Sequence, residues 1–131
     1  MRRSKLLNGE ISKLLSDLGH TQCVVLADAG LPVPVGVRLI DLSVARGLPS
    51  FVDVLNVIAE EFVCEKCVYA AEIEAKNPEC LAAIQKALGN VAYEAVPHET
   101  FKAMSGAALA VIRTGETRSY ANVLLYGGVD F

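Results

Sequence analysis

The stretch LGHTQCVVLADAGLP, residues 18–32, decides how this chain can fold. Its centre, residues 23–27, is a continuous apolar run of strand length, which is typical of a strand covered on both faces. A glycine precedes the run, and a glycine and two prolines follow it, so regular structure is expected to end on either side. The run therefore predicts a central strand, with His20 before it and Asp28 after it.

Helical periodicity alternates with further strand-like runs along the chain. Residues 11–18 carry apolar side chains at i, i+3, i+4 and i+7, with Asn8 as the predicted N-cap. Two more helices are expected, one capped by Ser50 with Asp53 at capping-box spacing and one with Asn77 as N-cap. The expected strands cover residues 23–27, 37–42, 66–72, 91–96, 108–113 and 122–126, and a short helix covers residues 99–104.

This alternation predicts a layered α/β domain with a mixed, largely parallel six-stranded sheet. The whole chain, residues 1–131, is expected to form one domain, because its length suits a single core and no linker or repeat interrupts it. Only residues 114–121 separate the last two strands. These strands are expected either to pair in antiparallel fashion or to be joined by a loop that carries the chain across the sheet.

Composition and charge exclude several classes of partner. The net charge of −3 and the lack of a basic patch beyond the N-terminus argue against nucleic-acid binding. No segment approaches the roughly 20 apolar residues of a membrane span, and no apolar segment of a signal peptide follows the first charges. We therefore expect a cytoplasmic protein without a nucleic-acid or membrane partner.

The four cysteines are expected to be reduced thiols. Cys64 and Cys67 have C-x-x-C spacing, but the pair follows a helix and enters a strand, which is the wrong context for a redox pair. A closed zinc site needs four ligands, usually as two paired motifs, and no second pair is present. We therefore predict buried or half-buried structural thiols and no metal site.

Polar residues stand at the ends of several expected strands. In open α/β sheets, ligands bind at the carboxyl ends of the strands, and Asp28, His98 and the loop after Arg113 all follow such ends. His20 stands at the opposite end of its strand. For His20 and Asp28 to share one site, either the turn at residues 19–22 folds back or a second subunit supplies part of the site.

Each of these residues also has a purely structural interpretation. His20 can interact with the C-terminus of the preceding helix, Asp28 can form a turn, and His98 can begin a helix. The chain has only two histidines, and both stand at element ends, which favours a functional interpretation. The residues alone thus indicate a small α/β domain with a polar site that uses His and Asp.

Six short motifs in register resemble those of one known family. They are residues 18–21 (LGHT), 27–32 (ADAGLP), 47–49 (GLP), 71–73 (AEI), 111–116 (VIRTGE) and 120–122 (YAN). Together they resemble the D-ribose pyranase family, relatives of L-fucose mutarotase, over residues 8–131. The resemblance implies a three-layer α/β/α fold in a homo-oligomer, commonly a decamer, with sites between subunits. It also implies an isomerase that interconverts the pyranose and furanose forms of D-ribose without a cofactor.

The resemblance assigns roles by position. His20 would be the catalytic proton donor, and Asp28 and His98 would bind the sugar hydroxyls. The rest of the pocket would come from the adjacent chain: Tyr120, Asn122 and the backbone around Ala121. The alternatives are a mutarotase for another sugar, such as L-fucose, and a non-catalytic ribose-binding partner of uptake.

Overall fold

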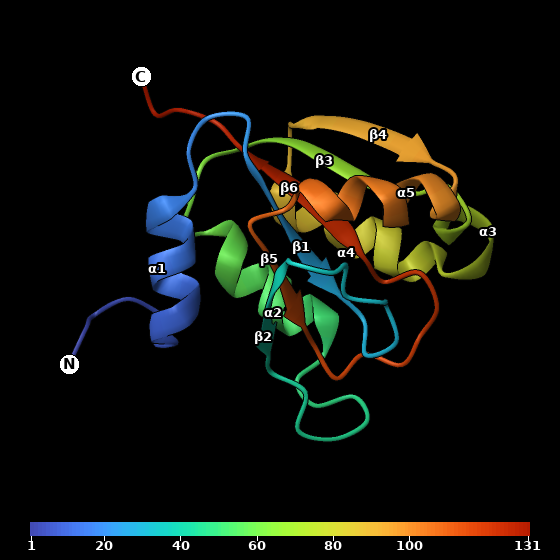
Figure 1. Cartoon of the computed structure of the whole chain (residues 1–131), viewed down its shortest axis with the longest axis horizontal. Helices are drawn as coiled ribbons and strands as arrows, with labels where there is room; N and C mark the ends of the chain where they lie inside the picture. Colours follow the sequence, from blue (N-terminus) through green and yellow to red (C-terminus); the bar gives the residue numbers. More distant parts are fainter.

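The computed structural model describes all 131 residues, which form a six-stranded sheet with helices on both faces (Figure 1). The strands are β1 (Cys23–Ala27), β2 (Arg38–Asp41), β3 (Cys64–Ala70), β4 (Ala92–Val96), β5 (Ala110–Arg113) and β6 (Val123–Gly127). The helices are α1 (Gly9–Asp17), α2 (Phe51–Ala59), α3 (Ile73–Lys76), α4 (Pro78–Leu88) and α5 (His98–Met104), followed by the 3-10 turn η1 (Ser105–Ala107). None of these helices combines the length and the apolar character that a bilayer crossing requires.

The strand order is β2-β5-β1-β6-β3-β4. β6 runs antiparallel to both of its neighbours, β1 and β3, while the other three pairs are parallel, so the predicted mixed, largely parallel sheet is confirmed. The last two strands, β5 and β6, do not pair with each other but lie on either side of β1. Of the two arrangements expected for them, the one with a connecting loop across the sheet is therefore confirmed. The loop after β5 carries the chain past β1, so it crosses the edge of the sheet where β1 ends.

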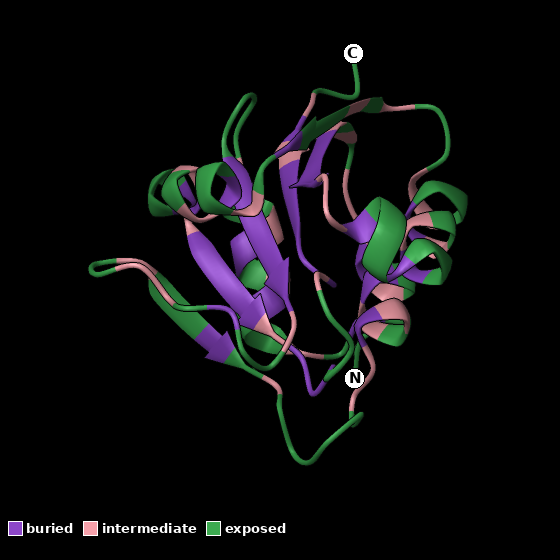
Figure 2. Cartoon of the chain, turned by 90° about the vertical axis from the view of Figure 1, so that its right-hand side faces the viewer, coloured by how far each residue is buried: buried purple, intermediate pink, exposed green.

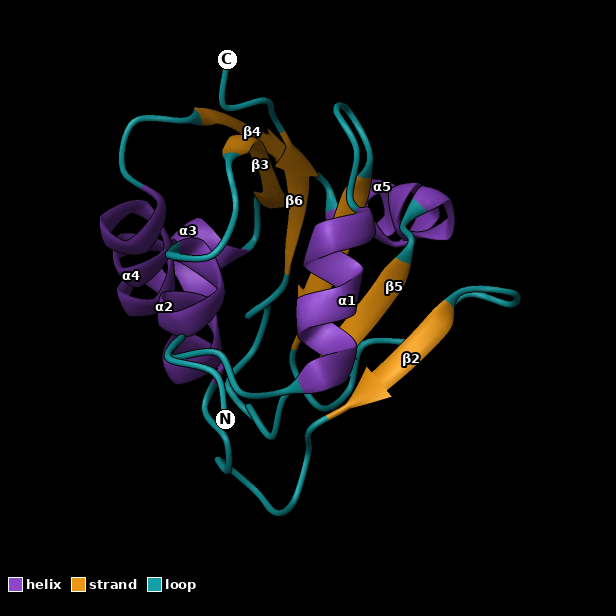
Figure 3. Ribbon diagram, turned by 90° about the vertical axis from the view of Figure 1, so that its left-hand side faces the viewer, coloured by secondary structure: helices purple, strands orange, loops and turns teal.

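The helices cover the two faces of the sheet unequally. α1 to α4 pack on one face, in a core that includes Leu14, Leu55 and Ile84. On the other face the only α-helix is α5, and its Phe101 is fully buried in a second cluster (Figure 3). Figure 2 shows the central strands buried between these layers. The three-layer α/β/α fold is therefore confirmed, with one thin outer layer.

Two of the three predicted helix caps are confirmed. Asn8 Oδ1 accepts a hydrogen bond from Ile11 N at 2.9 Å, and Ser50 Oγ accepts one from Asp53 N at 3.1 Å. Asn77 does occupy the N-cap position of α4, but its side chain does not cap the helix. Its Nδ2 instead donates to Ser119 O at 2.9 Å, which ties the start of α4 to the loop between β5 and β6.

The predicted range of β3 is displaced by two residues. The strand begins at Cys64 because pairing with β6, rather than burial, holds its polar first residues in the sheet. It ends at Ala70, and the short helix α3 follows. Periodicity does not predict α3, because a four-residue helix is too short to display a repeating apolar face.

The cysteines are structural thiols, as predicted. All four are free; Cys23, Cys67 and Cys80 are buried, and Cys64 is half-buried. Burial raises the pKa of Cys64 and that of Cys80 to about 11 each. These thiols therefore stay protonated, and poorly nucleophilic, at neutral pH.

Candidate functional site

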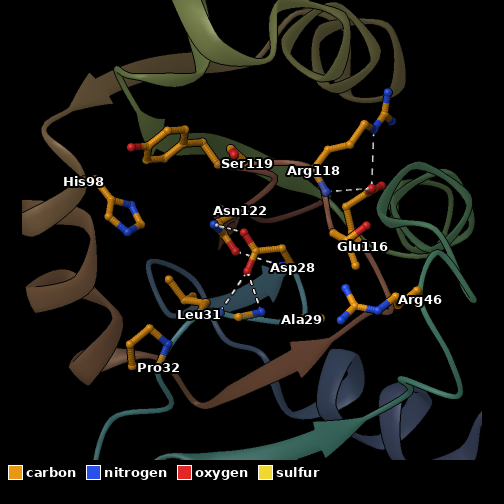
Figure 4. Close-up of a pocket in the computed structure, with 13 residues that line it drawn as sticks. Asp28, Ala29, Leu31, Pro32, Arg46, His98, Glu116, Arg118, Ser119 and Asn122 are labelled. Atoms are coloured by element: carbon orange, nitrogen blue, oxygen red, sulfur yellow. Dashed lines mark hydrogen bonds and ion pairs between the residues drawn. The ribbon is translucent and has the colours of Figure 1, made fainter.

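A cavity of about 490 Å³ opens at the edge of the sheet where β1 and β5 end (Figure 4). Its walls come from the segment after β1, the loop between β5 and β6, the start of α5, and Arg46 in the loop between β2 and α2. Four of the residues that the sequence singled out line it: Asp28, His98, Tyr120 and Asn122. They meet because the carboxyl ends of parallel strands lie at one edge, where the antiparallel β6 begins.

Asp28 and Asn122 form a reciprocal pair at the floor of the cavity. The Asp28 backbone N donates to Asn122 Oδ1 at 2.8 Å, and Asn122 Nδ2 donates to Asp28 Oδ2 at 2.9 Å. Asp28 Oδ1 accepts from the backbone N of Gly30 and of Leu31, at 3.0 and 2.8 Å. The structural interpretation of Asp28 as a turn residue is thus confirmed. One lone pair of Oδ2 and one N–H of Asn122 remain for a ligand.

The loop after β5 is clamped between β1 and the loop that carries Arg46. Thr114 donates its backbone N and its Oγ1 to Ala27 O, at 2.9 and 2.8 Å. A Cβ on Gly115 would lie 2.5 Å from Ala45 O and 2.5 Å from Leu48 O, so only glycine permits this close approach. The clamp places the next residue, Glu116, at the cavity wall.

Glu116 is a buried carboxylate with a dense set of donors. Its Oε1 accepts from Phe51 N at 3.3 Å, and its Oε2 accepts from the N and Nε of Arg118 at 3.3 and 3.4 Å. Burial raises the pKa of Glu116, but the hydrogen bonds from the Arg118 and Phe51 backbone amides and from the Arg118 guanidinium outweigh it, so the pKa lies below 4.5. Glu116 is therefore ionised at neutral pH.

The positive and negative formal charges of the groups that line the cavity are equal in number. Asp28 and Glu116 contribute two carboxylates, and Arg46 and Arg118 contribute two guanidinium groups, so their formal sum is zero. A phosphorylated ligand would favour an excess of positive charge. The lining is therefore better matched to a neutral polyol.

His98 sits at the first turn of α5, where both oxygens of Glu72 accept from its backbone N, at 3.0 and 3.1 Å. Its ring meets the Tyr120 ring edge-on, with the centroids 5.1 Å apart. The Nδ1 atom is buried and has no hydrogen-bond partner among the groups of the chain. Tyr120 itself has a left-handed φ of 59°. Backbone strain of this kind in a residue other than glycine is concentrated at functional sites.

One expectation about the pocket is corrected. The resemblance implied that Tyr120 and Asn122 reach the pocket from an adjacent chain, yet they share a cavity with Asp28 and His98 of their own chain. The reason is the course of the loop, which crosses the end of β1 before β6 begins. The side chain of Ala121 is fully buried among core residues, and the sugar-binding role of its backbone stays a prediction.

His20 lies outside this cavity. Its turn sits at the other end of β1, beside the C-terminal segment (Figure 1), and Thr21 N donates to Gly127 O at 2.9 Å. The five-residue β1 alone spans about 13 Å. The turn therefore does not fold back, and His20 is exposed with its Nε2 3.0 Å from Glu65 Oε2.

The sequence assigns no role to several residues of the cavity. Glu116 and Arg118 belong to the loop after β5, and Arg46 directly precedes the motif of residues 47–49. The carboxyl-end rule pointed to the first loop. Nothing local marks Arg46, because it reaches the cavity only through the clamp on Gly115.

Comparison with known proteins identifies the family. The model of the RbsD / FucU transport protein family matches residues 1–130. The chain belongs to this family. Among other members, the D-ribose pyranases of Exiguobacterium sibiricum and Bacillus licheniformis are 48% and 49% identical to it over 131 residues, which is the whole of each chain.

The solved structures agree with this RbsD / FucU membership. Bacillus subtilis RbsD complexed with D-ribose is 48% identical, with both chains covered fully and a TM-score of 0.96. The fucose mutarotase of Streptococcus pneumoniae, in complex with L-fucose, is 23% identical with a TM-score of 0.84 and full coverage of both chains. At that identity the second structure shows a common fold.

Proposed function

We propose that this protein is a D-ribose pyranase, which interconverts the pyranose and furanose forms of D-ribose by acid–base ring opening. The observation that carries the proposal is the full-length likeness to D-ribose pyranases at 48–49% identity. The similar RbsD structure is complexed with D-ribose. The charge-balanced, polar cavity beside β1 is where the sugar binds.

The cavity is suited to hold hydroxyl groups. A hydroxyl can donate to the remaining lone pair of Asp28 Oδ2 and accept from the remaining N–H of Asn122. His98 and Tyr120 stand beside this pair and limit the orientations of the ring. Because Asp28 and Asn122 are fixed by each other, the sugar meets preorganised partners.

The reaction needs two proton transfers. A basic nitrogen takes the proton of the anomeric hydroxyl and then delivers it to the ring oxygen, and the bond between the anomeric carbon and the ring oxygen breaks to give the open aldehyde. After rotation, a different hydroxyl attacks the aldehyde and the two transfers reverse. Histidine suits both roles because its charge changes near neutral pH.

His20 is the group that we propose for these transfers, and it reaches the sugar from a neighbouring copy of the chain. One chain holds its own His20 and its own cavity at opposite ends of β1. A head-to-tail contact between copies would bring the His20 end of one chain to the cavity end of the next. A homo-oligomer, such as a decamer, supplies contacts of this kind.

The test is NMR magnetisation exchange between ribose ring forms. The native protein is expected to accelerate exchange, and His20→Ala is expected to lower the catalysed rate by about 10²–10⁴-fold, the usual contribution of general acid–base catalysis. Calorimetric titration with ribose is expected to detect binding to both proteins. Full exchange activity in His20→Ala would refute the assignment of His20.

The same measurements separate the rival functions. A mutarotase for L-fucose would accelerate exchange of fucose more than that of ribose. A non-catalytic ribose-binding protein would bind ribose saturably without accelerating exchange. The proposed pyranase is expected to act on ribose in preference to fucose.

A further inference from the structure

We infer that Glu65 is a positioning residue for His20, which it holds with Nε2–H toward its own carboxylate and with Nδ1 free to exchange a proton with the sugar. The inference rests on the proposed function. The contact that suggests it joins His20 Nε2 and Glu65 Oε2 at 3.0 Å. A carboxylate only accepts hydrogen bonds, so Nε2 must carry the proton.

The backbone of β3 is distorted at Glu65. Cys64 pairs with Gly127 and Lys66 pairs with Tyr126, so two steps along β3 match one step along β6. Glu65 is the extra residue of this β-bulge. Bulges redirect a side chain and are common next to active sites. Here the redirected side chain is the one that meets His20.

A glycine leaves room for the carboxylate. A Cβ on Gly128 would lie 3.2 Å from Glu65 Cβ and 3.4 Å from Glu65 Oε2. Val63 Cγ1 would also lie 3.2 Å from that Cβ, so Glu65 and Val63 would have to move by a few tenths of an ångström. The absence of a side chain at position 128 thus gives Glu65 the room that it occupies beside His20.

The turn that carries His20 is itself held fixed. Thr21 has a left-handed φ of 67°, which is unfavourable for a β-branched residue. Gln22 Oε1 accepts from Gly19 N at 2.8 Å, and Gln22 O accepts from Gly127 N at 2.8 Å. With the backbone fixed, the contact with Glu65 selects the tautomer and rotation of the imidazole.

The contact is exposed, with the two side chains 53% and 41% accessible. Exposed ion pairs contribute little to folding stability, so variants of Glu65 are expected to fold. A role in orienting a proton-transferring ring explains why a strand is bulged and a turn is strained around a pair that stabilises the fold so little.

The test combines ring-form exchange with imidazole NMR on the full-length protein. In ¹⁵N-histidine-labelled protein, the His20 signals are assigned by their loss in His20→Ala, since the chain has only two histidines. Magic-angle-spinning spectra of the native assembly are expected to show the neutral imidazole of His20 as the tautomer with its proton on Nε2. In Glu65→Gln, whose amide can donate as well as accept, both tautomers are expected.

Glu65→Gln is also expected to lower the maximal exchange rate about tenfold, the lower end of the loss found when the outer-shell partner of a metal-bound histidine is removed, with unchanged ribose affinity. Gly128→Ala, which displaces Glu65 by only a few tenths of an ångström, is expected to lower the rate less. The matched control is Glu94→Gln, which removes a similarly exposed carboxylate 2.7 Å from Lys66 on the same part of the sheet. It is expected to leave both the rate and the tautomer unchanged.

Three results would contradict these proposals, and they distinguish failure of the positioning role of Glu65 from failure of the pyranase function. A native His20 protonated on Nδ1 alone, or a native exchange rate in Glu65→Gln, would refute the positioning role but leave the pyranase function intact. No acceleration of ribose exchange by the native protein would refute the proposed function and the positioning role together.

Discussion

A single carboxylate, Asp28, both shapes the turn after β1 and faces the cavity. Its Oδ1 is used by two backbone amides, and its Oδ2 is shared with Asn122. The structural and the ligand-binding interpretations of this residue are therefore compatible, since they use different oxygen atoms. A ligand that binds here meets an oxygen whose position is already determined by the backbone.

The Asp28–Asn122 pair is the first residue-scale prediction. Asn122→Asp replaces the donor Nδ2 by a charged oxygen about 3 Å from Asp28 Oδ2. We expect the free energy of unfolding to fall by about 1–3 kcal/mol, with a loss of ribose affinity, measured by urea unfolding and calorimetry. Asn56→Asp, at an exposed position on α2, is the control. Equal effects of the two substitutions would contradict the prediction.

Glu116 makes stability depend on pH in a predictable direction. Its folded pKa lies below 4.5, so its contribution is fully present above about pH 4.5, the pKa expected in the unfolded chain. As the pH falls through the folded pKa, the contribution is lost, because the unfolded state binds the proton first.

Glu116→Gln tests this linkage. The variant is expected to be less stable than the native protein at pH 7 by about 1.5–3 kcal/mol, the usual worth of hydrogen bonds to a charged group. The difference should shrink as the pH falls below 4.5, which urea unfolding at several pH values measures. Glu74→Gln, at an exposed carboxylate on α3, is the control. A pH-independent difference would show that Glu116 acts through packing alone.

At the scale of elements, the apolar run of residues 23–27 behaves as its pattern predicts. All five residues of β1 are buried, with β5 on one side and β6 on the other.

The loops are where prediction from the sequence is weakest. Residues 114–122 hold no regular element, yet they supply much of the cavity wall.

The clamp at Gly115 is the prediction at this scale. Gly115→Ala is expected to displace the loop that carries Arg46, because its Cβ would collide with Ala45 O and Leu48 O. Overpacking of this kind costs about 1–3 kcal/mol, which thermal and urea unfolding can measure. Gly106→Ala, where a Cβ meets nothing within 4 Å, is the control. If the two variants were equally stable, the clamp would have no energetic role.

At the scale of the whole molecule, the separation of His20 from the cavity has a direct consequence. If the site is shared between copies, two inactive chains can complement each other. Chains with His20→Ala still provide the cavity, and chains with Asn122→Asp still provide His20. Neither is expected to work alone.

Co-expression of the two variants tests the shared site. Random mixing in a head-to-tail contact pairs an intact His20 with an intact cavity in about a quarter of the sites. We therefore expect about a quarter of the native exchange activity, measured by ribose magnetisation exchange on the co-purified assembly. Mixing the same variants only after separate purification is the control. Activity no higher than that of either variant alone would place the whole site in one chain.

The sequence by itself determined the strands, the three long helices and the central position of β1, because burial leaves a local periodic record in side-chain chemistry. It also indicated Asp28 and His98 as neighbours, since strand ends converge at one edge. Only the tertiary structure decided that β6 lies between β1 and β3, that Asn122 pairs with Asp28 across 94 residues, and that Arg46 and Glu116 join the cavity. Pairing between distant segments depends on packing of the whole sheet, which no local pattern records. The same holds for His20 and Glu65, whose contact requires a β-bulge and a fixed turn to meet.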